Sequence, residues 1–373
     1  MDQVGTPRGD YRRRTRSAAP ALGVLVAALL LGACRDGTGD ERAEAWAPGS
    51  DIAPFVLGGA RVNVTSGGAD LVALDPLSFE PSAHRPSLAA RAPDGSWSTL
   101  PEPPSRYVSA ALGSANDRVV LVGAVCEDTC SDGGRLEVAL LDRDRRSWSV
   151  ADTDLEFTDA EPGISSLQAR GAVALFGTPA GRIQVDDTGA VEAVSTQPDL
   201  RPGSSASCLV GNQLVSANSV ATSGDGSGTS APMTFELHTV GVLDLDGAEG
   251  WETAERPAFT VAGAGSAACT AAGMLFLDSG VESTFDVASG RWEQRTIDHT
   301  GWTGALAPSP IGVSAVAPDR SVYAIDSLGS VVHRTLDGTW TDTGIDAMHL
   351  VATAEQVLGI RMLESTVVEI TAG

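Results

Sequence analysis

The feature that most constrains how this chain can fold is a tryptophan that returns at intervals of about 40–50 residues. Most copies follow a short polar turn, as Trp97 follows Asp94-Gly95-Ser96. Upstream of each copy lie small residues, a turn and a short run of apolar residues. The tryptophans in this position are Trp46, Trp97, Trp148, Trp251, Trp292 and Trp340.

The repeat predicts an all-β chain folded as a seven-bladed β-propeller. Small residues suit first strands that converge at a propeller centre, and an unbroken apolar run suits a second strand covered on both faces. Residues 46–373 shared among seven blades give about 47 residues each, which is a normal propeller repeat. Six or eight blades stay open, because the third and fourth repeats are irregular. The predicted hairpins span residues 63–74, 109–122, 165–176, 206–215, 267–277, 314–325 and 350–360. In the first, sixth and seventh of these the second strand is predicted at 71–74, 322–325 and 357–360.

The third strands of the repeats are predicted next, and the tryptophan lies in the fourth strand. In the third repeat the segment around Val191 takes the place of the tryptophan. The last repeat ends one strand short at Gly373, whereas Trp46 stands alone before the first hairpin. We expect the N-terminal strand around Trp46 to close the last blade, which would hide two open sheet edges. The third strands are predicted at 136–141, 182–185, 240–245, 283–287, 331–334 and 366–370.

The placement of the tryptophan resembles kelch repeats and the central propeller of galactose oxidase. The resemblance covers the whole repeat region, and it implies the same propeller fold. One part of the pattern differs: the glycine doublet usual after the second strand is mostly missing, and Gly123-Ala124 comes nearest to it.

The N-terminus predicts export. Four arginines between residues 12 and 16 precede an apolar run over 18–33, which is short for a membrane span. The run ends at Leu31-Gly32-Ala33-Cys34, which resembles the lipobox of bacterial lipoproteins and implies lipidation of Cys34. We expect a lipoprotein signal peptide at 1–33, a flexible acidic tether at 34–45 and the propeller at 46–373, anchored by lipid to the outer face of the cell membrane. The alternative is a plain secretory signal with an incidental cysteine.

Four further cysteines remain in the exported chain, and an even number favours two disulfides. Cys126 and Cys130 flank a short acidic turn that a disulfide could staple. Cys208 and Cys269 occupy matching positions in the first strands of neighbouring repeats. The alternative is metal binding, but a lone C-x3-C without a partnering histidine has no zinc-site spacing. We expect no metal and no cofactor.

Charge restricts the partners. Residues 1–33 hold five of the 25 basic and two of the 48 acidic residues, so the mature chain carries 20 minus 46, or −26. This charge disfavours nucleic acid and an anionic membrane surface as partners. We therefore expect membrane contact through the N-terminal lipid alone, with an envelope protein or a glycan as the partner.

The long connections predict where binding occurs. In a propeller, second-to-third and fourth-to-first connections open on one face, and here the long irregular segments are nearly all of these two kinds. Trp302, with Asp298 and His299, could offer an aromatic surface beside polar groups, or it could pack over a blade end. Four further candidates precede first strands, where the arginines could attract anions or pair with local carboxylates: Arg106, Tyr107, Arg201 and Arg256.

No catalytic signature is present in the sequence. A nucleophile elbow, a zinc-protease helix and a calcium loop are all absent, and the five histidines lack ligand spacing. We therefore predict a non-enzymatic binding or scaffold protein that uses its long-loop face. The alternative is a secreted glycosidase-like enzyme that uses carboxylates at the channel mouth, since acidic residues are abundant.

Overall fold

The computed structural model contains strands and no helix in the residues that it describes, so none of the described residues belongs to a helix able to cross a membrane. The apolar run at 18–33 lies outside those residues. The structure describes residues 53, 61–64, 71–75, 85–116, 118–126, 133–142, 144, 147–151, 153–158, 163–195, 204–222, 234–247, 250–254, 267–278, 280–297, 306, 314–353, 355–361 and 366–370.

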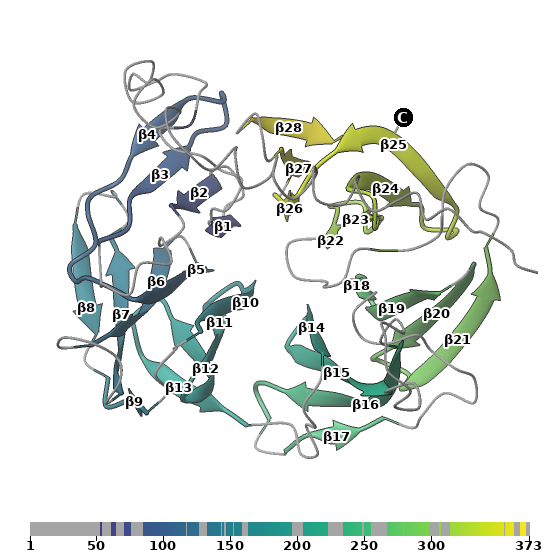
Figure 1. Cartoon of the computed structure of the whole chain (residues 1–373), viewed down its shortest axis with the longest axis horizontal. Helices are drawn as coiled ribbons and strands as arrows, with labels where there is room; N and C mark the ends of the chain where they lie inside the picture. Colours follow the sequence, from purple (N-terminus) through teal and green to yellow (C-terminus); the bar gives the residue numbers. More distant parts are fainter. Residues whose placement is uncertain are drawn as a thin grey trace, which may run out of the picture. The chain divides into compact units, whose positions relative to one another are not determined.

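The strands form seven antiparallel sheets, in which successive strands pair in chain order except that β9 (Glu156–Phe157) pairs with β7 (Gly134–Leu141). Each sheet is one blade of a seven-bladed β-propeller (Figure 1). Blade 1 contains β1 (Arg61–Val64), β2 (Leu71–Leu74), β3 (Leu88–Arg91) and β4 (Trp97–Thr99); blade 2 contains β5 (Ser109–Ala115), β6 (Arg118–Val125), β7 (Gly134–Leu141), β8 (Trp148–Ala151) and β9 (Glu156–Phe157); blade 3 contains β10 (Ser165–Arg170), β11 (Val173–Thr178), β12 (Gly181–Asp186) and β13 (Val191–Val194).

The remaining four blades follow the same plan. Blade 4 contains β14 (Ser204–Val210), β15 (Gln213–Thr222), β16 (Thr234–Asp244) and β17 (Glu252–Thr253); blade 5 contains β18 (Ala267–Cys269), β19 (Gly273–Asp278), β20 (Val281–Asp286) and β21 (Arg291–Thr296). Blade 6 contains β22 (Ser314–Val316), β23 (Val322–Ile325), β24 (Ser330–Arg334) and β25 (Trp340–Asp346); blade 7 contains β26 (His349–Ala352), β27 (Val357–Ile360) and β28 (Val367–Ile370).

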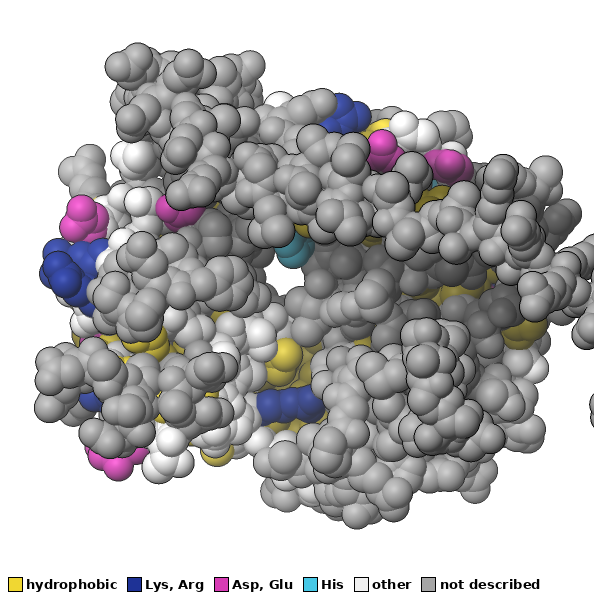
Figure 2. Space-filling model, in the orientation of Figure 1, with side chains coloured by type: hydrophobic (Ala, Val, Ile, Leu, Met, Phe, Trp, Pro, Cys, Tyr) yellow, Lys and Arg dark blue, Asp and Glu magenta, His cyan; other side chains and the backbone are white. Residues whose placement is uncertain are grey.

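The first strands of the blades make the inner wall of the ring. Each lies beside the first strand of the next blade, and β26 of blade 7 lies beside β1 of blade 1, so the ring closes. In the space-filling view an opening remains at its centre, with a histidine side chain at its upper edge and a hydrophobic and a basic side chain below it (Figure 2).

The hairpins lie where the repeat predicts them. The second strands of blades 1, 6 and 7 have the predicted bounds, and Trp97, Trp148 and Trp340 each begin a fourth strand. Trp292 is the second residue of β21, whereas Trp251 lies just before the very short β17. Strand β9, which adds a fifth strand to blade 2, was not predicted, because two residues carry no periodic pattern.

Packing between blades explains the unbroken apolar runs. Alternate residues of a strand point to opposite faces, so a second strand between two blades needs apolar residues at every position. In β6, Val120 and Val122 pack with blade 3, whereas Val119 and Leu121 pack with blade 1. The core of the protein is therefore a series of apolar clusters between successive blades.

The first strands carry small residues because neighbouring strands approach closely there. A Cβ added at Gly113 would lie 2.6 Å from the ring of Phe176 in the next blade. The hydroxyl of Ser109 accepts from the backbone N–H of Ile164 at 3.2 Å, and that of Ser314 accepts from Cys269 at the same distance. Small side chains thus let the backbones of successive blades approach.

A disulfide joins Cys208 of β14 to Cys269 of β18, with their Cα atoms 5.4 Å apart. This confirms the predicted bridge between matching positions of neighbouring first strands. Cys126 is also disulfide-bonded. Its predicted partner, Cys130, lies outside the described residues, so that pairing stays a prediction.

The closure of blade 7 is described only in part. Three strands of this blade are described, and Trp46 lies outside the described residues, so its predicted strand stays a prediction. Ala53, a few residues later, is buried among Ala73 and Trp97 of blade 1 and Ile360 of blade 7. Ala53 therefore lies at the interface at which the ring closes.

Candidate functional site

The antiparallel blades give the ring two unlike faces. First-to-second and third-to-fourth connections open on one face, which we call the turn face; the other connections open on the opposite face, the loop face. Connections on the turn face span only a few residues, as between β24 and β25. The longest intervals between strands, such as 223–233, 254–266 and 297–313, all belong to the loop face. This asymmetry agrees with the predicted distribution of long segments.

In several turns of the turn face an aspartate accepts hydrogen bonds from backbone and side-chain groups of the same turn. Asp94 accepts from the backbone N–H of Ser96 at 2.9 Å and from its hydroxyl at 2.6 Å. These hydrogen bonds hold the pKa of Asp94 below its usual value. Gly95 has a φ of 89°, as the predicted Asp-Gly hairpin turn requires. Asp319 does the same for Ser321. Such carboxylates stabilise turns and are already occupied.

A hollow of about 550 Å³ lies on the turn face between blades 2 and 3, lined by Arg118, Asp142, Asp187 and Thr188. Each guanidinium nitrogen of Arg118 donates to the protein itself: to the carbonyls of Leu141 and Asp187 and to the hydroxyl of Ser149. The arginine is thus a link between two blades. The described residues contain no group of three or more acidic, histidine or cysteine side chains able to hold a metal ion.

On the loop face, two of the predicted binding residues are described, and they differ in their exposure to solvent. Arg106 is exposed, as a ligand contact must be. Tyr107, also predicted as a contact, is wholly buried, which corrects that prediction. Its hydroxyl donates to Glu137 at 2.7 Å, and Ser105 donates to the other carboxylate oxygen at 2.8 Å. Burial, together with the hydrogen bond to Glu137, raises the pKa of Tyr107.

The ring of Tyr107 is accommodated by a glycine. A Cβ at Gly123 would lie 2.1 Å from Cδ1 of the tyrosine ring. Gly123 interrupts an otherwise apolar second strand, so a close approach at this point was readable from the sequence. The tyrosine therefore fixes the connection between blades 1 and 2 and leaves Arg106 at the surface.

Gly123→Ala is expected to lower the free energy of unfolding by about 1–3 kcal/mol, because the added methyl group must displace the Tyr107 ring. Urea denaturation measures the effect. Gly163→Ala is the matched control, because a Cβ there meets no atom within 4 Å. Equal denaturation midpoints for the two variants would contradict the packing described here.

The other predicted binding residues lie outside the described part of the chain, so their roles stay predictions. They are Trp302, His299, Asp298, Arg201 and Arg256.

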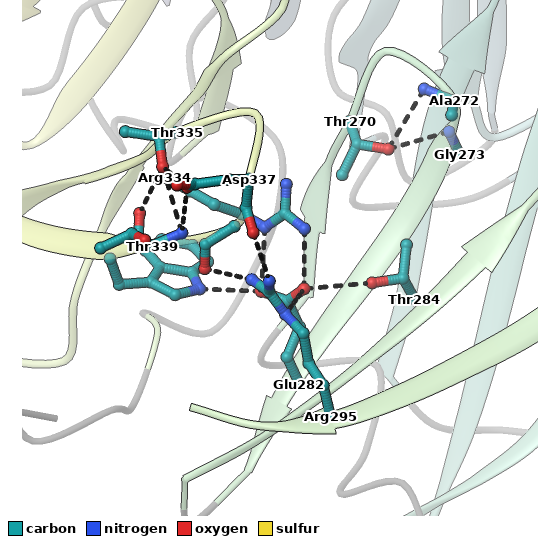
Figure 3. Close-up of polar contacts among 12 residues, drawn as sticks. Thr270, Ala272, Gly273, Glu282, Thr284, Arg295, Arg334, Thr335, Asp337 and Thr339 are labelled. Atoms are coloured by element: carbon teal, nitrogen blue, oxygen red, sulfur yellow. Dashed lines mark hydrogen bonds and ion pairs between the residues drawn. The ribbon is translucent and has the colours of Figure 1, made fainter. Parts of the chain in front are cut away.

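A cluster that sequence reasoning missed lies between blades 5 and 6 (Figure 3). Glu282 of β20 is 1% exposed and accepts from both Arg295 and Arg334. The four nitrogen-to-oxygen distances run from 2.8 to 3.1 Å. The indole of Trp340 donates to the same carboxylate at 2.8 Å. Glu282 therefore links its own strand to β21, β24 and β25, and Arg295 also donates to the backbone carbonyls of Asp337 and Gly338 in the turn between β24 and β25.

The cluster holds blades 5 and 6 together and offers no free catalytic group, because its carboxylate is paired with two arginines. Burial alone would raise the pKa of Glu282, but the hydrogen bonds from Arg334 and Arg295 outweigh it and hold the pKa below the ordinary value. An ionised carboxylate whose two oxygens are both occupied cannot serve as a general acid. Little in the sequence pointed to this cluster, because Glu282 lies between Val281 and Ser283, one residue before the predicted third strand at 283–287.

The comparisons with known proteins identify no family for this chain. No family model and no curated protein matches the sequence. Among solved structures, the chain is similar to a crystal structure of a mutant puromycin hydrolase complexed with PGG, at 14% identity and a TM-score of 0.47. The match covers 85% of this chain and 54% of that one, so the chain spans about half its length. A likeness of this extent identifies no activity.

Proposed function

We propose that this protein is an exported, lipid-anchored propeller that binds an envelope protein or a glycan through its loop face. The observation that carries the proposal is the asymmetry between the two faces. In the described turns of the turn face, aspartates such as Asp94 and Asp319 accept hydrogen bonds within the turn, whereas the longest intervals between strands belong to the loop face. Connections of variable length on a rigid scaffold are where binding sites usually lie.

Two features support the proposed location. The segment Leu31–Cys34 after a basic and apolar stretch is the reason to expect lipidation. The Cys208–Cys269 disulfide fits an oxidising compartment outside the cytoplasm. The kelch-like character of the repeat stays a proposal that rests on the tryptophan placement alone.

The alternative, a glycosidase-like enzyme, needs two carboxylates facing a sugar-sized cleft. The buried carboxylates among the described residues already accept hydrogen bonds from other groups of the protein. Glu137 accepts from Tyr107 and Ser105, Glu282 accepts from two arginines, and Asp326 accepts from backbone N–H groups of its own turn. This favours binding over hydrolysis as the first function to test.

Cys34→Ala is expected to move the protein from the membrane fraction to the soluble fraction, because lipid is the proposed anchor. Fractionation and immunoblotting of cells that express each form measure the shift. Thr38→Ala, in the predicted tether, provides a control for a substitution close to the export signal. Membrane partitioning that is unchanged in Cys34→Ala would refute the anchor and leave the binding proposal standing.

The binding proposal is tested with purified protein on a glycan array and against envelope extract, comparing wild type with Trp302→Ala. We expect a specific ligand whose retention falls at least tenfold in the variant. Full retention by Trp302→Ala would remove Trp302 from the site. Turnover of a glycan by the purified protein would replace the proposal with the enzymatic alternative.

A further inference from the structure

The joint between blades 6 and 7 contains a buried histidine. Tyr323 and Val331 of blade 6 lie in one apolar cluster with Val357 of blade 7. His333 follows Val331 by two residues in β24, so its side chain is on the same face of the sheet and is directed at blade 7. It is 7% exposed and is the only histidine that is buried in the described part of the chain. A side chain that titrates near neutral pH therefore lies between two blades.

The ring of His333 packs against that of Tyr323. The two residues are direct partners across β23 and β24, and their ring centres lie 4.5 Å apart with 23° between the planes. Nε2 of His333 is shielded from water and has no hydrogen-bond partner among the described residues. A neutral imidazole can place its lone pair at this nitrogen, whereas the protonated ring carries an N–H at both nitrogens. Protonation would thus bury a charge and leave a donor without an acceptor, and both cost stability.

The charged groups around this ring do little to hold a proton on it. On the same strand, Arg334 points to the other face and binds Glu282. Asp319, in the turn between β22 and β23, favours the protonated ring, but it is exposed and already accepts from Ser321. The other charged residues toward this end of the packed elements are exposed: Arg320, Asp342, Glu355 and Glu369. The remaining charged or titratable residues of these strands lie at their loop-face ends: Asp326, Asp346, His349 and Arg361.

Burial lowers the pKa of His333 below its ordinary value, and the opposing effect of Asp319 is smaller. We propose that His333 makes the joint between blades 6 and 7 acid-sensitive: the neutral ring lets the blades pack, and protonation loosens them at the turn-face end of β24. On an exported chain such a joint would respond to the pH of the surroundings. The inference itself depends neither on lipid anchoring nor on recognition by the loop face.

The direction of the effect follows from proton linkage. The pKa of His333 in the closed joint lies below the ordinary value of 6.5, so below pH 6.5 the opened joint binds more protons than the closed one. The stability that His333 contributes is complete above pH 6.5 and is lost as the pH falls through the pKa of the closed joint. This range begins above that of Glu282, whose ordinary pKa is 4.5.

The first test compares thermal unfolding at about pH 7.5 and about pH 5.5, on either side of the ordinary titration of histidine. His333→Phe keeps an aromatic ring against Tyr323 and cannot titrate. Between the two conditions we expect wild type to lose about 2 °C more in Tm than His333→Phe. His349→Gln is the matched control, because it removes a half-buried histidine at the other end of the joint, in β26. It should keep the response of wild type.

Equal losses of Tm in wild type and His333→Phe would overturn the proposal. So would a His349→Gln protein that loses the pH response as fully as His333→Phe, because the response would then not belong to this ring.

Hydrogen exchange tests whether the loosening is local. After correction for the intrinsic effect of pH, amides of β24 and β27 in wild type should exchange roughly threefold faster or more at the lower pH, whereas amides of β11 and β12 in blade 3 should not. In His333→Phe the difference between the two regions should disappear. Exchange that rises equally in all blades of wild type would overturn the assignment to this joint.

A last measurement needs no variant and decides the matter if His333→Phe fails to fold. The five histidines of the chain can be titrated by NMR in the wild-type protein, and the ring of His333 is identified by its contact with the ring of Tyr323. We expect it to titrate below the ordinary pKa of 6.5. Titration at or above that value would show that the folded protein accepts the proton without cost and would overturn the proposal.

Discussion

Glu282→Gln is expected to lower the free energy of unfolding by about 3 kcal/mol, near the lower end of what breaking a buried ion pair costs. The amide would leave two guanidinium groups without their shared counter-charge and would turn a donor toward them. The lower end applies because the Arg295 side chain is 36% exposed, so water relieves part of the loss. Urea denaturation followed by tryptophan fluorescence measures the change.

Glu293→Gln provides the control, because Glu293 lies on the adjacent strand β21 and is exposed. We expect that variant to denature like wild type. A Glu282→Gln protein as stable as the control would show that the cluster contributes nothing to holding blades 5 and 6 together.

The same carboxylate predicts a pH dependence. The pKa of Glu282 is lower in the folded chain than its ordinary value of 4.5, so below that value the unfolded chain binds more protons. Stability from Glu282 is therefore complete above pH 4.5 and is lost as the pH falls through the folded pKa. Glu282→Gln should lose less stability than wild type over that acidic range. Parallel curves for the two proteins would contradict the assigned role.

Removing the disulfide with the double variant Cys208→Ala/Cys269→Ala should cost about 2–4 kcal/mol. The bridge closes a loop with a sequence separation of 61 and links the inner strands of blades 4 and 5. Its loss raises the conformational entropy of the unfolded chain and removes a covalent link between these two blades. Thermal and urea denaturation of both forms measure the cost.

Cys208→Ala alone serves as a comparison, because it already breaks the bridge. It should lose nearly as much stability as the double variant, since the second substitution removes only one sulfur atom. If either variant denatures like wild type, the bridge is not what holds these blades together.

The strand plan of the blades could be predicted because burial on two faces leaves a plain mark in the sequence. A second strand such as β27 is apolar at every position, and it has the predicted bounds of Val357–Ile360. The disulfide could be predicted because Cys208 and Cys269 repeat the same strand position in adjacent blades. In both cases equivalent positions of successive repeats lie in adjacent blades, so the spacing along the sequence predicts which segments are neighbours in the fold.

The polar contacts could not be predicted in the same way, because they depend on how outer strands of different blades meet. Glu282 and Arg334 are 52 residues apart and belong to different blades. Tyr107 lay in the predicted connection, but the direction of its ring depended on space left at Gly123, in the second strand of the next blade. Side-chain direction in connections follows tertiary packing, which a repeat pattern does not encode.

Recognition through the loop face is tested most directly by blocking each face in turn. Arg106→Cys places a thiol on the loop face between blades 1 and 2, and Asp144→Cys places one on the turn face of blade 2, both at exposed positions. Each protein is coupled to a bulky maleimide polymer and compared with its uncoupled form for capture of ligand from envelope extract or a glycan array. We predict that the polymer at residue 106 abolishes capture and that the polymer at residue 144 leaves it intact. Capture that survives the block at 106, or is lost with the block at 144, would contradict the account.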